Sequence, residues 1–215
     1  MKQFAVVLAG CGAFDGAEIH EAVLTLLAIK KAGADYRIFA PDVNQYHVIN
    51  HITGDVSDET RNTLIEAARI ARGKIFPLSS FSSEDFDALV FPGGFGAAKN
   101  LCTYAYDGVE FKVNKDVERV IKHMHKLRKP IGAMCIAPVI LAKVLKNIGI
   151  TIGNDKKTAA DIVKLGASHK IASFTEVVID TDNLVFTTPC YMLDADILHV
   201  AAGTENIINA MMQSM

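Results

Sequence analysis

Apolar residues gather in short continuous runs along this chain, and each run ends at a glycine, a proline or a cysteine. The clearest runs cover residues 4–9, 88–91 and 131–134. A run of this length and composition is typical of a strand buried on both faces of a parallel sheet. Weaker patterns predict further strands at residues 36–40, near Ile150, at 176–180 and at 184–188.

Between these runs, apolar residues recur at the spacing of a helix that is buried on one face. The pattern predicts helices at residues 17–32, from Ser57 or Asp58 to about Arg72, at 113–126, 136–145, 158–165 and 193–211. Residues 43–56 alternate polar and apolar positions, which indicates a hairpin or a surface excursion. Strands and helices alternate throughout, so we expect a doubly wound α/β sandwich with a mainly parallel sheet.

The composition sets limits on the class of protein. The chain has 215 residues, half of them hydrophobic, and a formal net charge of −2. This length is enough for one domain with a substantial core, and we expect a single domain over residues 1–215. Basic residues form no stripe or block, and no apolar run approaches the roughly 20 residues that span a bilayer. We therefore expect neither nucleic acid nor a membrane as a partner.

The cysteines indicate a reducing compartment. The four of them are scattered along the chain without a CxxC pair, which is typical of reduced thiols rather than of a disulfide framework. Residues 8–11 resemble a lipoprotein cleavage site, but the apolar run before them is too short for a signal-peptide core. We therefore predict a cytoplasmic protein.

One cysteine has a local sequence that suggests chemistry. Cys135 ends the run 131–134 and precedes a helical pattern, with the small residues Ala133 and Ala137 two positions to either side. This is the pattern of a nucleophile elbow, in which strand and helix nearly touch. A position at a helix N-terminus also predicts a lowered thiol pKa. A buried structural cysteine remains an equal alternative for this stretch alone.

In a doubly wound sheet, ligands collect beyond the carboxyl ends of the strands, and several candidate residues fall there. They are Glu18, His20 and Glu21 at the first helix, Gly93 and Gly94 after the run 88–91, and Cys135 with Ile136 at the elbow. The amides of Gly93, Gly94 and Ile136 could receive a developing oxyanion, and a carboxyl group could act as acid or base. Asn154, Pro189 and Cys190 are further pocket candidates, although Cys190 could equally be an inert apolar thiol.

Motifs for metals and nucleotides are absent. The histidines show no HExxH or Cys/His spacing, and the first glycine loop is followed by neither GxGxxG nor GK[ST]. We predict no metal and no cofactor.

The chain resembles the cysteine proteins of the class I glutamine-amidotransferase-like (PfpI) superfamily over nearly its whole length. The stretches that carry the resemblance are 15–24, 64–70, 92–100, 134–138 and 187–189. It is most similar to the ElbB-type branch, known as isoprenoid-biosynthesis glyoxalases or enhancing-lycopene-biosynthesis proteins. The resemblance implies a flavodoxin-like three-layer sandwich, a homodimer and a cofactor-free glyoxalase that converts glyoxal, or methylglyoxal, to the hydroxy acid.

The same resemblance implies that Cys135 adds to the aldehyde and that a glutamate moves a proton between the two carbons. Counting back from Ala32-Gly33 selects Glu21 as this acid, whereas the loop pattern 14–18 selects Glu18. We favour Glu21, because the number of residues in a helix without gaps is physically more constrained than the number in a loop.

Two departures from the superfamily pattern argue against related activities. Ile136 replaces the histidine that follows the nucleophile in related proteases, and the downstream His-x-Glu of glutaminase domains is missing. We therefore expect neither a peptidase nor a glutaminase. We also expect the turnover to be low. A non-catalytic redox sensor and a metabolite-binding accessory protein of isoprenoid biosynthesis remain alternatives.

Overall fold

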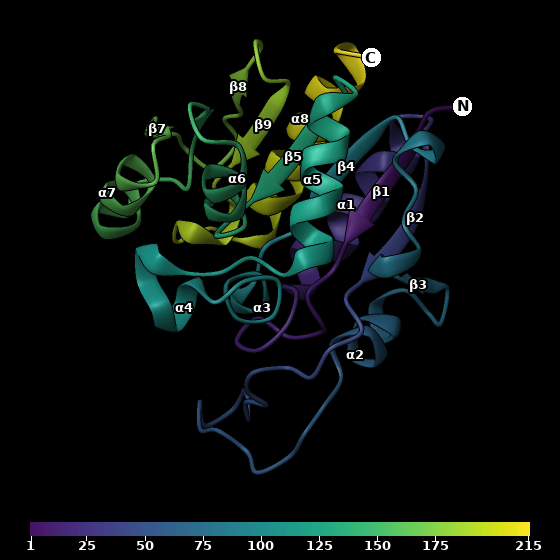
Figure 1. Cartoon of the computed structure of the whole chain (residues 1–215). Helices are drawn as coiled ribbons and strands as arrows, with labels where there is room; N and C mark the ends of the chain where they lie inside the picture. The colour runs from purple at the N-terminus through teal and green to yellow at the C-terminus, as the bar shows by residue number, and fades with distance from the viewer.

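A twisted seven-stranded sheet forms the centre of the computed structural model, which describes residues 1–215 (Figure 1). Its strand order is β3-β2-β1-β4-β5-β9-β8, and every neighbouring pair is parallel except β8 with β9. The strands are β1 (Gln3–Val7), β2 (Asp35–Ala40), β3 (Ile75–Pro77), β4 (Ala88–Phe91), β5 (Ile131–Met134), β8 (Val178–Asp180) and β9 (Val185–Thr188). A separate two-stranded sheet pairs β6 (Gly149–Ile150) with β7 (Ser168–His169).

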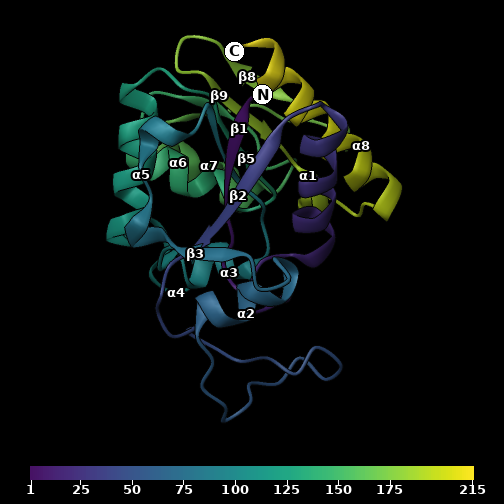
Figure 2. The same cartoon turned by 90° about the vertical axis from the view of Figure 1, so that its right-hand side faces the viewer.

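Helices cover both faces of the sheet, which gives the three layers expected from the sequence. In Figure 2, α1 and α8 lie on one side of the sheet, and α5 and α6 lie on the other. The longer helices are α1 (Ile19–Lys31), α2 (Thr63–Ile70), α5 (Lys115–Lys126), α6 (Pro138–Leu145), α7 (Lys156–Lys164) and α8 (Ile197–Gln213), with short helices α3 (Phe95–Lys99) and α4 (Tyr104–Asp107). The architecture is the flavodoxin-like, class I glutamine-amidotransferase-like fold.

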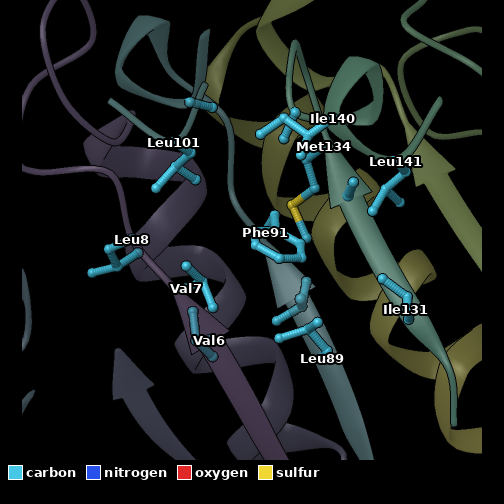
Figure 3. Close-up of a cluster of buried hydrophobic side chains, with 14 of the residues drawn as sticks. Val6, Val7, Leu8, Leu89, Phe91, Leu101, Ile131, Met134, Ile140 and Leu141 are labelled. Atoms are coloured by element: carbon cyan, nitrogen blue, oxygen red, sulfur yellow. The ribbon is translucent and has the colours of Figure 1, made fainter. Parts of the chain in front are cut away.

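The core lies on both faces of the central strands. All residues of β4, β5 and β9 are buried, as a continuous apolar run between two helical layers requires. Side chains from β1, β4 and β5, such as Val6, Leu89 and Ile131, gather with Ile140 of α6 in Figure 3. This packing fixes the carboxyl ends of β1, β4 and β5 relative to one another, and the candidate site lies at those ends.

Several boundaries differ from the sequence prediction, and capping explains most of them. The helix predicted from Ser57 or Asp58 begins only at Thr63, because the Asn62 side chain accepts hydrogen bonds from the amides of Leu64 and Ile65. The last helix begins at Ile197 behind an Asp196 cap rather than at residue 193. The strand predicted near Ile150 belongs to the small second sheet.

Residues 43–62 form an arm that projects from the body of the molecule in both views (Figures 1 and 2). Only two isolated antiparallel bridges, Asn44 to Asn62 and Ile49 to Val56, connect its two sides. Two stacked ring pairs attach the arm to the body: Tyr46 with Tyr106, at 3.9 Å between centroids, and His51 with Phe14, at 4.9 Å.

Candidate active site

Cys135 lies on a strained turn between β5 and α6. Its φ of 57° is in the left-handed region, which residues other than glycine adopt rarely and at a cost. The amide of Cys135 donates to the carbonyl of Thr188 in the next strand, at 3.1 Å, and this bond helps to hold the turn. The side chain is only 7 % exposed. The sequence pattern around Cys135 therefore corresponds to the geometry of a nucleophile elbow.

The Glu21 side chain lies beside Cys135 and is completely buried. Its Oε2 accepts from the Gly93 amide at 2.8 Å, and its Oε1 accepts from the Tyr191 amide at 3.2 Å. A Cβ placed at Gly93 would lie 2.7 Å from Oε2 and 3.0 Å from the Cys135 sulfur, so the carboxyl oxygen and the thiol both lie next to this glycine. Burial raises the pKa of Glu21 to about 8, although the hydrogen bonds from these amides act to lower it. Glu21 is therefore mainly protonated at pH 7.

Glu18 has a different position from Glu21. It is the N-cap of α1, and its Oε2 accepts a hydrogen bond from the Glu21 amide at 2.7 Å. Its side chain reaches the wall of the cavity described below, whereas no hydrogen bond joins it to Cys135. Of the two glutamates weighed from the sequence, Glu21 is the one that lies next to Gly93 and the thiol.

The thiol of Cys135 is not the low-pKa group that its place before a helix predicted. Burial, followed by the charge of Glu21, raises the pKa of Cys135 well above its ordinary value. The backbone amides of Gly94 and Ile136 act in the opposite direction, but burial outweighs them. The influence of Glu21 disappears when its carboxyl is protonated, so the two groups titrate as a coupled pair.

Gly93 plays a different part from the predicted oxyanion donor. Its amide is already bonded to Glu21, so of the predicted donors only the amides of Gly94 and Ile136 act on the Cys135 thiol. A Cβ added at Gly93 would lie 2.3 Å from Cys135 Cβ and 2.7 Å from Glu21 Oε2. Only glycine fits between the thiol and the carboxyl group.

A cavity of about 1060 Å³ opens above the thiol. Cys135, Ile136 and Gly94 form part of its lining, and His20 and Tyr191 form another part. The His20 ring nitrogen Nδ1 is 2.8 Å from the Tyr191 hydroxyl. The remaining wall comes from the loop between β1 and α1, from α3 and α4, and from α7.

The other pocket candidates do not line this cavity. Asn154 is exposed outside it, and Pro189 and Cys190 are buried. Burial raises the pKa of the Cys190 thiol well above its ordinary value, which fits an inert apolar thiol. All four cysteines are free, so Cys11 forms no disulfide with Cys135.

Sequence reasoning missed the wall that faces the thiol. Tyr191, Tyr104 and Lys157 belong to no motif and reach the cavity only because the chain folds back from distant positions. No group of three or more His, Cys, Asp and Glu side chains is arranged to hold a metal ion. None of the helices is long and apolar enough to cross a lipid bilayer.

A buried thiol on an elbow, beside a glutamate and at the carboxyl edge of this sheet, defines a cysteine protein of the class I glutamine-amidotransferase-like fold. Residues 11–189 match the DJ-1/PfpI family, and the chain belongs to that family. It is 47 % identical, over 97 % of its length and 82 % of theirs, to two named proteins. These are the rat "ES1 protein homolog, mitochondrial" and the human "Glutamine amidotransferase-like class 1 domain-containing protein 3, mitochondrial".

A solved structure extends this similarity. The isoprenoid biosynthesis protein with amidotransferase-like domain from Ehrlichia chaffeensis is 34 % identical, with a TM-score of 0.93 over 99 % of this chain and all of that one. The resemblance seen in the sequence is thereby confirmed at the level of the family and of such a neighbour.

The relatives correct one prediction. Both mammalian proteins are named mitochondrial, which contradicts the cytoplasmic location expected from the sequence. Neither the pattern of a secretory signal nor the use of cysteine distinguishes the cytoplasm from the mitochondrial interior, because both compartments are reached without a secretory signal and keep thiols reduced.

Proposed function

We propose that this protein is a cofactor-independent glyoxalase that converts glyoxal or methylglyoxal to the corresponding hydroxy acid. The observation that carries the proposal is the position of the buried Glu21 carboxyl group next to Cys135, a cysteine that itself lines an open cavity. A nucleophile of this kind can add to a carbonyl carbon, and a neighbouring carboxyl group can then move protons between the atoms around it.

The first step joins the sulfur to the aldehyde carbon. Glu21, as carboxylate, takes the thiol proton, and the sulfur electron pair forms the new S–C bond. The carbonyl oxygen gains negative charge, which the amides of Gly94 and Ile136 stabilise, and a proton from Glu21 completes the hemithioacetal. Only the ionised fraction of Glu21 can start this step, and its raised pKa keeps that fraction small at pH 7.

The second step moves a proton between the two carbons. The Glu21 carboxylate removes the C–H proton next to sulfur, and the electron pair passes to the neighbouring carbonyl to form an enediolate. The species formed carries one negative charge on the neighbouring oxygen until the proton of the hemithioacetal hydroxyl passes to that oxygen. Glu21 returns its proton to the neighbouring carbon, which gives an α-hydroxy thioester, so one carbon is oxidised and the other reduced without an external electron acceptor. Water then cleaves the thioester and releases the hydroxy acid and the thiol.

The redox-sensor alternative has less support. Sensor cysteines are low-pKa and accessible, whereas the Cys135 thiol has a raised pKa and is almost completely buried.

The test is a glycolate assay on purified protein with glyoxal at millimolar concentration, beside the variants Cys135→Ser, Glu21→Gln and Glu18→Gln. We expect Cys135→Ser to lose all measurable turnover and Glu21→Gln to lose at least about 100-fold, as is usual for a general acid–base residue. Glu18→Gln, a matched carboxyl-to-amide change at the same helix end, should retain most of the activity. An unchanged rate in Cys135→Ser would refute the proposal.

A further inference from the structure

The cavity is far larger than a two-carbon dialdehyde requires. Its volume of about 1060 Å³ slightly exceeds the roughly 300–1,000 Å³ found for sites that enclose drug-sized ligands. Glyoxal bonded to Cys135 would fill only the base of this space and leave the rest to water. The size of the cavity therefore indicates a substrate with a substantial group attached to the α-oxoaldehyde.

The walls indicate the chemistry of that group. Eleven of the twenty lining residues are hydrophobic, and three of the aromatic lining residues are exposed, although Phe14 and Tyr106 each stack one face of the ring on the arm. Phe14 is 42 % exposed, Phe95 is 53 % exposed and Tyr106 is 40 % exposed. Aromatic side chains that gather around a concave site and remain exposed are typical of a surface that a ligand covers.

The charged residues that line the cavity narrow the class of substrate further. Four carboxylates line the cavity, Glu18, Asp107, Asp155 and Asp161, and Lys157 is the only lysine or arginine that does so. Repulsion by these groups disfavours an anionic substrate, such as a phosphate ester or a carboxylic acid, in a partly enclosed site.

From this cavity, which joins exposed aromatic rings and an acidic lining to the Cys135 thiol, we infer that the preferred substrates are uncharged α-oxoaldehydes with a bulky apolar or aromatic substituent. This inference rests on the proposed glyoxalase function and specifies its substrate class. The aldehyde carbon reacts at the base of the cavity, while the substituent lies against Phe95 and Phe14.

The first experiment compares kcat/KM for glyoxal, phenylglyoxal and 4-carboxyphenylglyoxal. We expect phenylglyoxal to exceed glyoxal by about 10-fold or more, the gain that burial of one aromatic ring provides. The carboxylated compound should be several-fold worse than phenylglyoxal, and the difference should shrink at high salt. Equal values for glyoxal and phenylglyoxal, or a preference for the carboxylated compound, would overturn the inference.

A pair of matched variants locates the effect. Phe95→Ala should lower the ratio of kcat/KM for phenylglyoxal over glyoxal by about 5-fold or more. Phe76→Ala removes a ring of similar exposure, 49 %, from β3 outside the cavity, and the ratio should stay unchanged. A fall of the same size in both variants would contradict the assigned position of the substituent.

A binding measurement separates this inference from the proposed function. Acetophenone has the aromatic group but no aldehyde, so it should bind reversibly to both the wild type and Cys135→Ser and inhibit glyoxal turnover competitively. If Cys135→Ser retained full turnover, the glyoxalase proposal would fail, whether or not acetophenone binds. If turnover depended on Cys135 but acetophenone neither bound nor inhibited, only the inference about the substrate class would fail.

Discussion

The burial of Glu21 has a consequence for stability that can be measured without any substrate. In the unfolded chain a glutamate has a pKa near 4.5, whereas burial raises the pKa of Glu21 to about 8 in the folded protein. Between these values the folded state binds more protons than the unfolded state, so Glu21 makes the free energy of unfolding fall as pH rises. The contribution is fully present below the unfolded pKa and is lost as pH rises through the folded one.

The magnitude follows from the two pKa values. At about 1.4 kcal/mol for each pH unit, the difference between 4.5 and about 8 makes wild-type stability fall by about 3 to 4 kcal/mol from pH 5 to pH 8 through this residue alone. Glu21→Gln removes the titration. The substitution also replaces one of the two accepting oxygens by an NH₂ group, which then faces the main-chain amide of Gly93 or Tyr191. That amide loses its acceptor, and the loss costs about 1 to 3 kcal/mol of stability independently of pH.

The assay is urea unfolding of wild type and Glu21→Gln at several pH values between 5 and 8. We expect the variant to have a lower free energy of unfolding than the wild type at pH 5. The difference between the two should then shift in favour of the variant by about 3 to 4 kcal/mol as pH rises to 8. Glu18→Gln controls for a carboxyl-to-amide change at the helix end. A constant difference between wild type and Glu21→Gln at all pH values would refute the assignment of Glu21 as a buried, proton-retaining group.

Three further outcomes are expected. The kcat/KM for glyoxal should rise about 5-fold from pH 7 to pH 8, because the ionised fraction of Glu21 grows through its pKa of about 8; a flat profile over this range would contradict a carboxylate base. Gly93→Ala should lower turnover at least tenfold, since the added methyl group meets Cys135 Cβ at 2.3 Å, and circular dichroism would check that the fold persists. Asn62→Ala should lower the free energy of unfolding by about 1 kcal/mol through loss of the α2 cap, with the glyoxal rate as its control.

The sequence predicted those parts of the molecule that local patterns determine. The buried strands and the elbow at Cys135 follow from short apolar runs and from small residues at fixed spacing, which need no knowledge of distant contacts. Glu21 was favoured over Glu18 by the resemblance to related proteins, through its distance from Ala32-Gly33 at the end of the first helix, and it is Glu21 that lies next to Gly93 and the thiol. Helix length is a stricter guide than a loop, because each helical residue advances the chain by a fixed rise.

The remaining features depend on tertiary packing. The helix dipole predicted a low pKa for Cys135, but burial and the neighbouring Glu21 reverse the direction, and burial cannot be judged from a local pattern. The Gly93 amide was expected to be free because its acceptor, Glu21, lies 72 positions away in sequence. The wall that includes Tyr191 is likewise assembled from distant segments.

The hydrogen bond from the Tyr191 amide to Glu21 joins residues that are 170 positions apart. The carboxyl group that serves Cys135 is therefore held by the start of the protein and by a segment near its end. During synthesis on the ribosome, this hydrogen bond cannot form until most of the polypeptide has emerged. Nascent chains and fragments truncated before this tyrosine consequently lack a finished reaction centre, so a reactive thiol–acid pair arises only in the completed fold.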